Sequence, residues 1–324
     1  MTAVRSADGI RIRIDDGRKI AADASDPGDE LPVLSHAHGD HLYSEPPDSI
    51  VASPLTRELA AVRRDGPVPE ELDPAWIDAI PAGHVPGSRA FLIDGTERVL
   101  YTGDCSTRDR FGMAGFEPVS AEVLIVESTY GKPTYRLPPQ AETEAEIVDW
   151  LADTRDRPVI LLGYALGRAQ ELLELAARAG RSRIRYTQAI DALNGPIEAA
   201  RGEPLPGQVG TDVEPKPGDA LVLPAQTGSL SFVKQLRRDH DAPLAGFSGW
   251  AVEERYRYAR DLDVAFPLSD HCDFDELLAV VRAVDPDQVY TVHGFVDELA
   301  AAVQSRLGIQ ARALKPNQTS LEEF

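Results

Sequence analysis

Six of the seven histidines in this 324-residue chain lie in short polar motifs whose residue types bind metals or transfer protons. His36, His38 and His41 lie with Asp40 in the segment SHAHGDH, residues 35–41. The other three are His84, His271 and His293, in the segments GHVPGS, SDHCD and TVHG. Imidazole is the commonest metal ligand and the usual acid–base group near neutral pH. The sequence therefore predicts a protein built around one metal centre.

The spacing within SHAHGDH suits a metal site. Alternate residues of an extended segment point the same way, so His36, His38 and Asp40 can converge while His41 turns toward a neighbouring position. Imidazoles with a carboxylate and no thiolate suit zinc, manganese or iron and are typical of a catalytic site. Two adjacent ions need a shared ligand, and Asp104 can bridge them.

Apolar runs of strand composition end directly before several of these polar residues. The runs are 32–34 before His36, 98–102 before Asp104, 123–126 before Glu127 and 288–292 before His293. Active sites of α/β proteins lie at the carboxyl ends of strands, so the four runs predict one shared site. The middle of the chain repeats the α/β pattern, with a strand at 158–162 and a helix at 168–179. Because polar motifs precede and follow it, this middle part is predicted to be an insertion.

The acidic composition does not exclude a nucleic-acid substrate. A net charge of −20 normally argues against nucleic acid, but the acidic residues are spread along the chain and lysine is scarce. That composition resembles proteins of salt-loving organisms. In molar salt the Debye length is about 3 Å, so the repulsion between such an acidic surface and a polyanion is screened. We expect a cytoplasmic protein with no membrane partner, because no long apolar segment is visible. Cys105 and Cys272 are expected to be buried packing residues, with a redox role as the alternative.

The motifs resemble those of a known superfamily. SHAHGDH, Gly83-His84 and the segment YTGD, residues 101–104, are similar to successive motifs of the metallo-β-lactamase superfamily. Four more segments resemble its β-CASP branch, which processes nucleic acids: ESTYG (127–131), GYALGRAQEL (163–172), SDH (269–271) and VHG (292–294). The resemblance runs in order from about residue 31 to 296. It implies an α/β fold, an αββα four-layer sandwich at 1–134 and 262–324 with a β-CASP domain inserted at 135–261.

The same resemblance implies a ligand set for two divalent ions, with zinc as the preferred metal and manganese as the alternative. One ion is expected on His36, His38 and His84, the other on Asp40, His41 and His293, with Asp104 between them. Glu127, His271 and His293 match the three β-CASP motifs in that order. The implied catalytic residues are His271 as the proton donor, Glu127 as the carboxylate that holds it, and Asp40.

Four further residues are candidates for substrate contacts. Arg168 lies in the first turn of a helix that follows a glycine turn, and there it can hold a backbone phosphate. Trp250 can stack on a base, with Ser248 beside it, and Ser88 near His84 is a weaker phosphate candidate. Packing roles are the alternative for each of them.

The leading hypothesis is a two-metal nuclease that cleaves single-stranded nucleic acid with a metal-activated hydroxide and a histidine general acid. RNA is favoured, as in mRNA 3′-end processing or decay, and a ligase-associated DNA exonuclease is the alternative. A small-molecule metallohydrolase and an inactive scaffold subunit are less favoured. The sequence leaves the oligomeric state open, with a homodimer as one option.

Overall fold

The computed structural model describes residues 2–211 and 214–315, whose contacts divide the chain into two compact units. The first unit contains the chain up to Asp109, Met113–Tyr135 and the chain from His271 onward. The second contains Arg110–Gly112 and Arg136–Asp270, so it is inserted into the sequence of the first. The domain limits stated from the sequence stay predictions; the compact units divide at 135/136 and 270/271.

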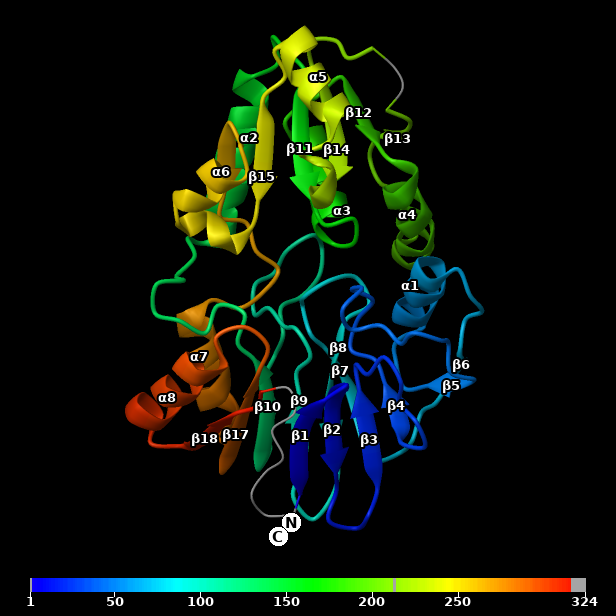
Figure 1. Cartoon of the computed structure of the whole chain (residues 1–324), viewed down its shortest axis with the longest axis vertical. Helices are drawn as coiled ribbons and strands as arrows, with labels where there is room; N and C mark the ends of the chain where they lie inside the picture. Colours follow the sequence, from blue (N-terminus) through cyan, green and yellow to red (C-terminus); the bar gives the residue numbers. More distant parts are fainter. Residues whose placement is uncertain (1, 212–213, 316–324) are drawn as a thin grey trace. The chain divides into compact units, whose positions relative to one another are not determined.

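Two sheets form the first unit (Figure 1). The four-stranded sheet has the order β1-β2-β3-β4, with β1 (Ala3–Ala7), β2 (Gly9–Arg13), β3 (Lys19–Ala22) and β4 (Leu31–Val33). The six-stranded sheet has the order β18-β17-β10-β9-β8-β7, with β7 (Ile77–Pro81), β8 (Arg89–Ile93), β9 (Val99–Tyr101), β10 (Val123–Glu127), β17 (Gln288–Val292) and β18 (Gln310–Ala313). The remaining elements are the pair β5 (Ser49–Ile50) and β6 (Glu70–Glu71) and the helices α1 (Pro54–Arg64), α7 (Phe274–Val284) and α8 (Val296–Leu307).

Side chains of the six-stranded sheet alternate between two apolar cores. Ile125 of β10 faces the four-stranded sheet and packs in one core with Ile12 of β2. Its neighbour Leu124 belongs to the other core, with Leu277 of α7 and Leu299 of α8. Successive side chains of a strand point to opposite faces, and β10 is covered on both, so its sequence is a continuous apolar run. The fold therefore buries β10 completely and presents polar residues where the strand ends.

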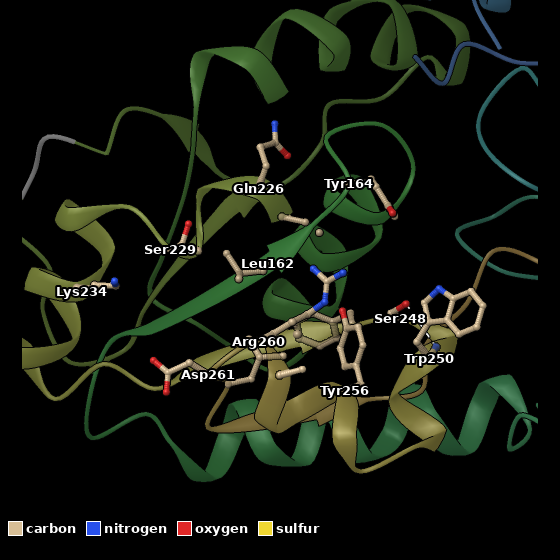
Figure 2. Close-up of a pocket in the computed structure, with 17 residues that line it drawn as sticks. Leu162, Tyr164, Gln226, Ser229, Lys234, Ser248, Trp250, Tyr256, Arg260 and Asp261 are labelled. Carbon is tan, nitrogen blue, oxygen red and sulfur yellow. Dashed lines mark hydrogen bonds between the residues drawn. The ribbon is translucent and has the colours of Figure 1, made fainter. Parts of the chain in front are cut away.

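The second unit is built on a parallel six-stranded sheet. Its order is β13-β12-β14-β11-β15-β16, with β11 (Val159–Gly163), β12 (Arg183–Tyr186), β13 (Gln208–Val209), β14 (Asp219–Pro224), β15 (Leu244–Phe247) and β16 (Val264–Phe266). Its helices are α2 (Gln140–Asp153), α3 (Arg168–Arg178), α4 (Gln188–Arg201), α5 (Ser231–His240) and α6 (Arg255–Ala259), with 3₁₀ turns η1 (Ala225–Thr227) and η2 (Gly249–Val252). A pocket lies at the carboxyl ends of β11, β14 and β15 (Figure 2).

Within the two described stretches of the chain, no helix combines the length and the apolar character that crossing a lipid bilayer requires.

The turn after β17 has a backbone conformation that L-residues rarely adopt. His293 has φ of 55° and Gly294 has φ of 66°. A Cβ on Gly294 would lie 2.4 Å from the carbonyl oxygen of Ser128, so position 294 has neither the conformation nor the space for a side chain. Gly294 thus fixes where the chain leaves β17.

We predict that Gly294→Ala lowers the free energy of unfolding by more than the matched change Gly308→Ala. Gly308 has φ of 72° but open space around its Cβ position, so its substitution adds only backbone strain, of about 1 kcal/mol. Gly294→Ala adds a backbone clash, and we expect a total loss of roughly 2–4 kcal/mol. Urea unfolding of both variants measures the difference, and equal losses would refute a steric role for Gly294.

Candidate metal centre

The strand ends of the six-stranded sheet bring polar residues to one edge. β9, β10 and β17 are parallel neighbours, with Tyr101 opposite Ile125 and Glu127 opposite Val292. Carboxyl ends of parallel strands in register lie side by side. Asp104, Glu127 and His293 therefore lie near one another although they are far apart in the sequence.

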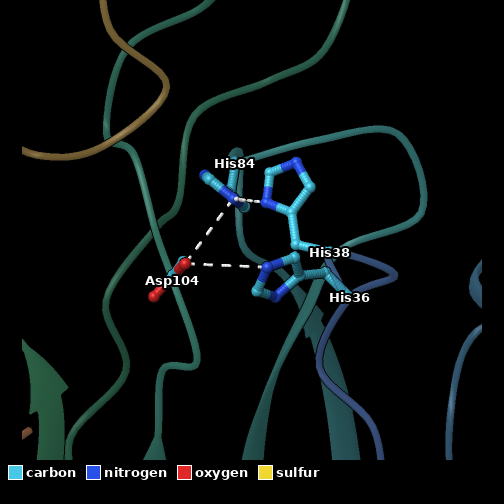
Figure 3. Close-up of side chains that lie close together, drawn as sticks. All are labelled: His36, His38, His84 and Asp104. Atoms are coloured by element: carbon cyan, nitrogen blue, oxygen red, sulfur yellow. Dashed lines mark hydrogen bonds and ion pairs between the residues drawn. The ribbon is translucent and has the colours of Figure 1, made fainter. Parts of the chain in front are cut away.

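Four of the predicted ligands form one cluster. His36, His38, His84 and Asp104 each present one ligand atom, and these atoms lie within 4.8 Å of one another (Figure 3). Oδ2 of Asp104 lies 3.6 Å from Nε2 of His36 and 3.7 Å from Nε2 of His84. Nε2 of His84 lies 3.1 Å from Nδ1 of His38. Nitrogen and oxygen donors thus converge on one small volume.

His41, the last residue of the SHAHGDH motif, reaches the same carboxylate. Its Nε2 lies 3.5 Å from Oδ2 of Asp104, and its Nδ1 lies 2.9 Å from Oδ2 of Asp23. Asp23 is buried and also accepts hydrogen bonds from the hydroxyls of Tyr101, at 2.7 Å, and Ser35, at 2.5 Å. A carboxylate behind a histidine fixes which nitrogen carries the proton and leaves the other for a metal.

Asp23 is a buried carboxylate of this cluster that the sequence analysis did not single out. It follows β3 directly, so it had the same signal as Asp104, a carboxylate at the end of an apolar strand. Burial alone would raise its pKa, but the hydrogen bond and charge of His41 hold the pKa below its usual value. Asp23 is therefore ionised.

Two predicted ligands, Asp40 and His293, lie outside the close clusters of the described residues. The Asp40 side chain is 85% exposed, and its Oδ2 lies 4.0 Å from Nε2 of His41. His293 is exposed, and its ring centroid lies 5.1 Å from that of His41. Both thus lie at the solvent side of His41, and their assignment as ligands stays a prediction.

The donors fit a divalent metal. Nε2 of His36 is buried and has no hydrogen-bond partner among the described residues, which is costly unless something else binds it. Burial and the surrounding imidazoles hold the pKa of His36 well below its usual value, so its ring is neutral. His41 differs: burial opposes its charge, but Asp104 and Asp23 raise its pKa to about 9. A metal bound at His41 near neutral pH would therefore displace a proton.

His271 and Glu127 form a pair beside this cluster. Nδ1 of His271 lies 2.8 Å from Oε1 of Glu127, and the ring centroids of His271 and His84 are 4.5 Å apart. Burial would raise the pKa of Glu127, but the His271 imidazole and hydrogen bonds from Thr129 and Cys105 hold it below its usual value. Glu127 is thus an ionised, fully buried carboxylate that accepts a hydrogen bond from the Nδ1–H of His271.

The two cysteines join the segments that carry Asp104 and His271. Cys105 and Cys272 are buried and free, with their sulfur atoms 4.0 Å apart. The hydrogen bond to Cys272, together with burial, raises the pKa of the Cys105 thiol well above its usual value. A buried thiol of this kind is unreactive, which favours the packing role predicted for the pair.

The predicted substrate residues have different surroundings. Arg168 is buried in the second unit and pairs with Glu171 at 2.8 Å and Asp270 at 3.1 Å. This gives it a structural role, and its contact with a phosphate stays a prediction. Ser88 is buried, and its hydroxyl accepts a hydrogen bond from the backbone N–H of Val85.

Ser248 and Trp250 lie elsewhere, in the lining of the pocket of the second unit (Figure 2). The Ser248 hydroxyl accepts a hydrogen bond from the backbone N–H of Trp250 at 3.4 Å, and Ser248 is the N-cap residue of η2.

We predict that Asp23→Asn weakens metal binding about 10–100-fold, because the amide removes the charge that orients His41. The dissociation constant is measured by competition with a chromogenic chelator. Tyr101→Phe, which removes one hydrogen bond to Asp23, should weaken binding less. Asp78→Asn is the control, since this carboxylate is exposed on β7. Unchanged affinity in a folded Asp23→Asn protein would show that Asp23 does not orient a ligand.

Comparisons with known proteins give a match to one family model and several relatives. Residues 264–314 match the family model of the Zn-dependent metallo-hydrolase RNA specificity domain. A probable DNA ligase of Opitutus terrae is 31% identical over 303 residues, which are 89% of this chain and 29% of that protein. Cleavage and polyadenylation specificity factor subunit 3 of Dictyostelium discoideum is 39% identical over 97 residues, 28% of this chain and 12% of that protein. Endoribonuclease YSH1 of Saccharomyces cerevisiae is 42% identical over 100 residues, 29% of this chain and 13% of that protein.

This chain thus spans less than a third of the length of each of these three relatives. The two packed sheets of the first unit and the inserted α/β unit confirm the predicted fold class. The histidine and aspartate cluster agrees with binding of divalent metal. The fold and these matches support the β-CASP branch of the metallo-β-lactamase superfamily as the family of this chain.

Proposed function

We propose that this protein is a nuclease that hydrolyses phosphodiester bonds of single-stranded nucleic acid. It would use two divalent ions, with zinc as the preferred metal and manganese as the alternative. The observation that carries the proposal is the His271–Glu127 pair, 2.8 Å apart, beside the cluster around Asp104. A metal cluster alone suits many hydrolases. A buried carboxylate that holds a histidine at its rim adds a proton donor, which a poor alkoxide leaving group needs.

Divalent ions on His36, His38, His84, His41 and Asp104, joined by the predicted ligands Asp40 and His293, would polarise the phosphate and supply a nucleophile at neutral pH. The chain's own residues do the rest. Asp23 keeps the Nδ1 proton on His41 and directs its Nε2 toward Asp104. Glu127 likewise keeps the Nδ1 proton on His271, so its Nε2 delivers the proton to the departing oxygen.

RNA is the first candidate substrate and DNA the second. The match to an RNA specificity domain and the endoribonuclease relatives favour RNA. The relative that aligns with 89% of this chain is a probable DNA ligase, which favours a DNA substrate. The predicted salt adaptation, cytoplasmic location and homodimer belong to the same proposal.

End-labelled RNA and DNA of one sequence should separate the two substrates. We expect metal-dependent cleavage of single-stranded RNA in roughly molar KCl, where the acidic surface is screened. Removal of the metal with a chelator should abolish cleavage, and added zinc or manganese should restore it. Cleavage of DNA alone would reverse the substrate order. Cleavage of neither polymer by metal-loaded protein would refute a nuclease.

We predict that His271→Ala keeps its metal but loses about 10²–10⁴-fold in turnover, because the leaving oxygen departs without a proton. A nucleotide p-nitrophenyl ester tests the role directly, since its leaving group needs no protonation. If His271 is the acid, the variant should retain far more activity on this ester than on RNA. An equal loss on both substrates would instead assign His271 a structural role.

Two further variants serve as comparisons for His271→Ala. Glu127→Gln keeps the size of the side chain but removes the charge that holds His271, so an intermediate loss of turnover is expected. His240→Ala, at the end of α5, should change turnover less than about twofold, as surface substitutions usually do.

A further inference from the structure

The pocket of the second unit lies at a position where parallel sheets bind ligands. β11 continues through α3 to β12, whereas β14 continues through α5 to β15, on the other side of β11. The connections of the adjacent strands β11 and β14 therefore leave in opposite directions. Open α/β sheets bind ligands in the crevice at the carboxyl ends of such strands.

The side chains of β11 show that the two helices cover opposite faces. Leu162 packs in one core with Leu223 and with Val233 of α5. The next residue, Gly163, faces Arg168 and Leu172 of α3. Because no helix can cover both faces at this point, the loops after β11, β14 and β15 border an open pocket of about 440 Å³, the size of a small-molecule site.

Aromatic side chains line one part of this pocket. Tyr164, in the loop after β11, is 62% exposed although it is a large aromatic residue. Trp250 of η2 and Tyr256 of α6 also line the pocket, and the Ser248 hydroxyl lies next to Trp250 (Figure 2). Exposed rings in a concave site provide stacking surfaces for a flat ligand.

The pocket also carries positive charge in a chain of net charge −20. Arg260 and Lys234 both line it, and the Arg260 guanidinium lies over the Tyr256 ring, 5.0 Å from its centroid. Among the residues that the structure describes, neither cation has a carboxylate at ion-pair distance. Asp261 also lines the pocket, and its carboxylate pairs at 2.8 Å with Arg237, which pairs with Asp263 at 3.1 Å as well. Two unneutralised cations beside stacking rings suit an anion attached to an aromatic group.

We propose that this pocket binds one nucleotide unit, with its base on Trp250 and Tyr164 and its phosphate on Arg260 and Lys234. The unit belongs to the single strand on which the proposed nuclease acts, so the inference rests on that function for its biological ligand. The binding chemistry itself requires no turnover. A nucleoside monophosphate contains no phosphodiester bond, and its binding can be measured whether or not the protein is a nuclease.

Calorimetry and tryptophan fluorescence with the metal-loaded full chain test this site. The probes are adenosine 5′-monophosphate, adenosine, ribose 5-phosphate and a short oligoadenylate, the last with the His271→Ala protein so that it stays intact. We expect the monophosphate to bind at least about tenfold more tightly than either of its parts, because stacking and phosphate contacts both contribute. Trp250→Leu should lose about tenfold in affinity and the ligand-induced quenching, and Trp250→Phe should retain most of the affinity.

Arg260→Ala and Lys234→Ala should weaken binding and flatten its salt dependence. Lys216→Ala is the matched control, since this exposed lysine of the same unit precedes β14 at the amino end of the sheet. Tighter binding of the oligomer than of the monophosphate supports a place on the strand, and equal binding supports the pocket as a site for released nucleotide. Equal affinity for ribose 5-phosphate and the monophosphate, or unchanged affinity in Arg260→Ala and Trp250→Leu, would overturn the proposal.

Discussion

The arrangement of the candidate metal centre in the first unit depends on the carboxylate of Asp104. Its Oδ2 lies 3.5–3.7 Å from the Nε2 atoms of three histidines that come from two separate loops. Burying these polar groups costs free energy, and the two apolar cores on either face of the six-stranded sheet offset it. The parallel register of β9, β10 and β17 then fixes where Asp104 and its neighbours can lie. A shift of one residue in that register would move Asp104 away from the histidines.

The same physical device occurs twice around this centre. Asp23 after β3 holds Nδ1 of His41, and Glu127 at the end of β10 holds Nδ1 of His271. Each carboxylate is buried, yet its pKa lies below the usual value because the imidazole and other donors surround it. Each histidine therefore keeps its Nδ1 proton and presents Nε2 to the site. Nε2 of His41 faces the Asp104 carboxylate at 3.5 Å, and Nε2 of His271 is the proton carrier of the proposed mechanism.

Much of the site could be predicted, because its information is local. The spacing in SHAHGDH and the apolar runs before Asp104 and Glu127 predicted residues that the structure brings together, except for Asp40, whose side chain is 85% exposed. Asp23 was missed because it lies in none of the motifs that carry the resemblance, and its partner His41 is reached only through the fold. Arg168 shows the same limit, since its position in a helix suggests a phosphate contact, whereas its ion pair with Asp270 comes from a residue about a hundred positions away. Long-range contacts of this kind leave no pattern in the neighbouring sequence.

The acidic composition changes how a polyanion can be recognised. At low salt a net charge of −20 repels nucleic acid, and at high salt long-range steering is screened for either sign of charge. Affinity then has to come from contacts at short range, where stacking and charged hydrogen bonds are weakened less by ions. The pocket of the second unit combines both, since aromatic rings and two cations line the same space. A protein of this composition therefore gains more from a few cations placed beside aromatic rings than from a broad basic surface.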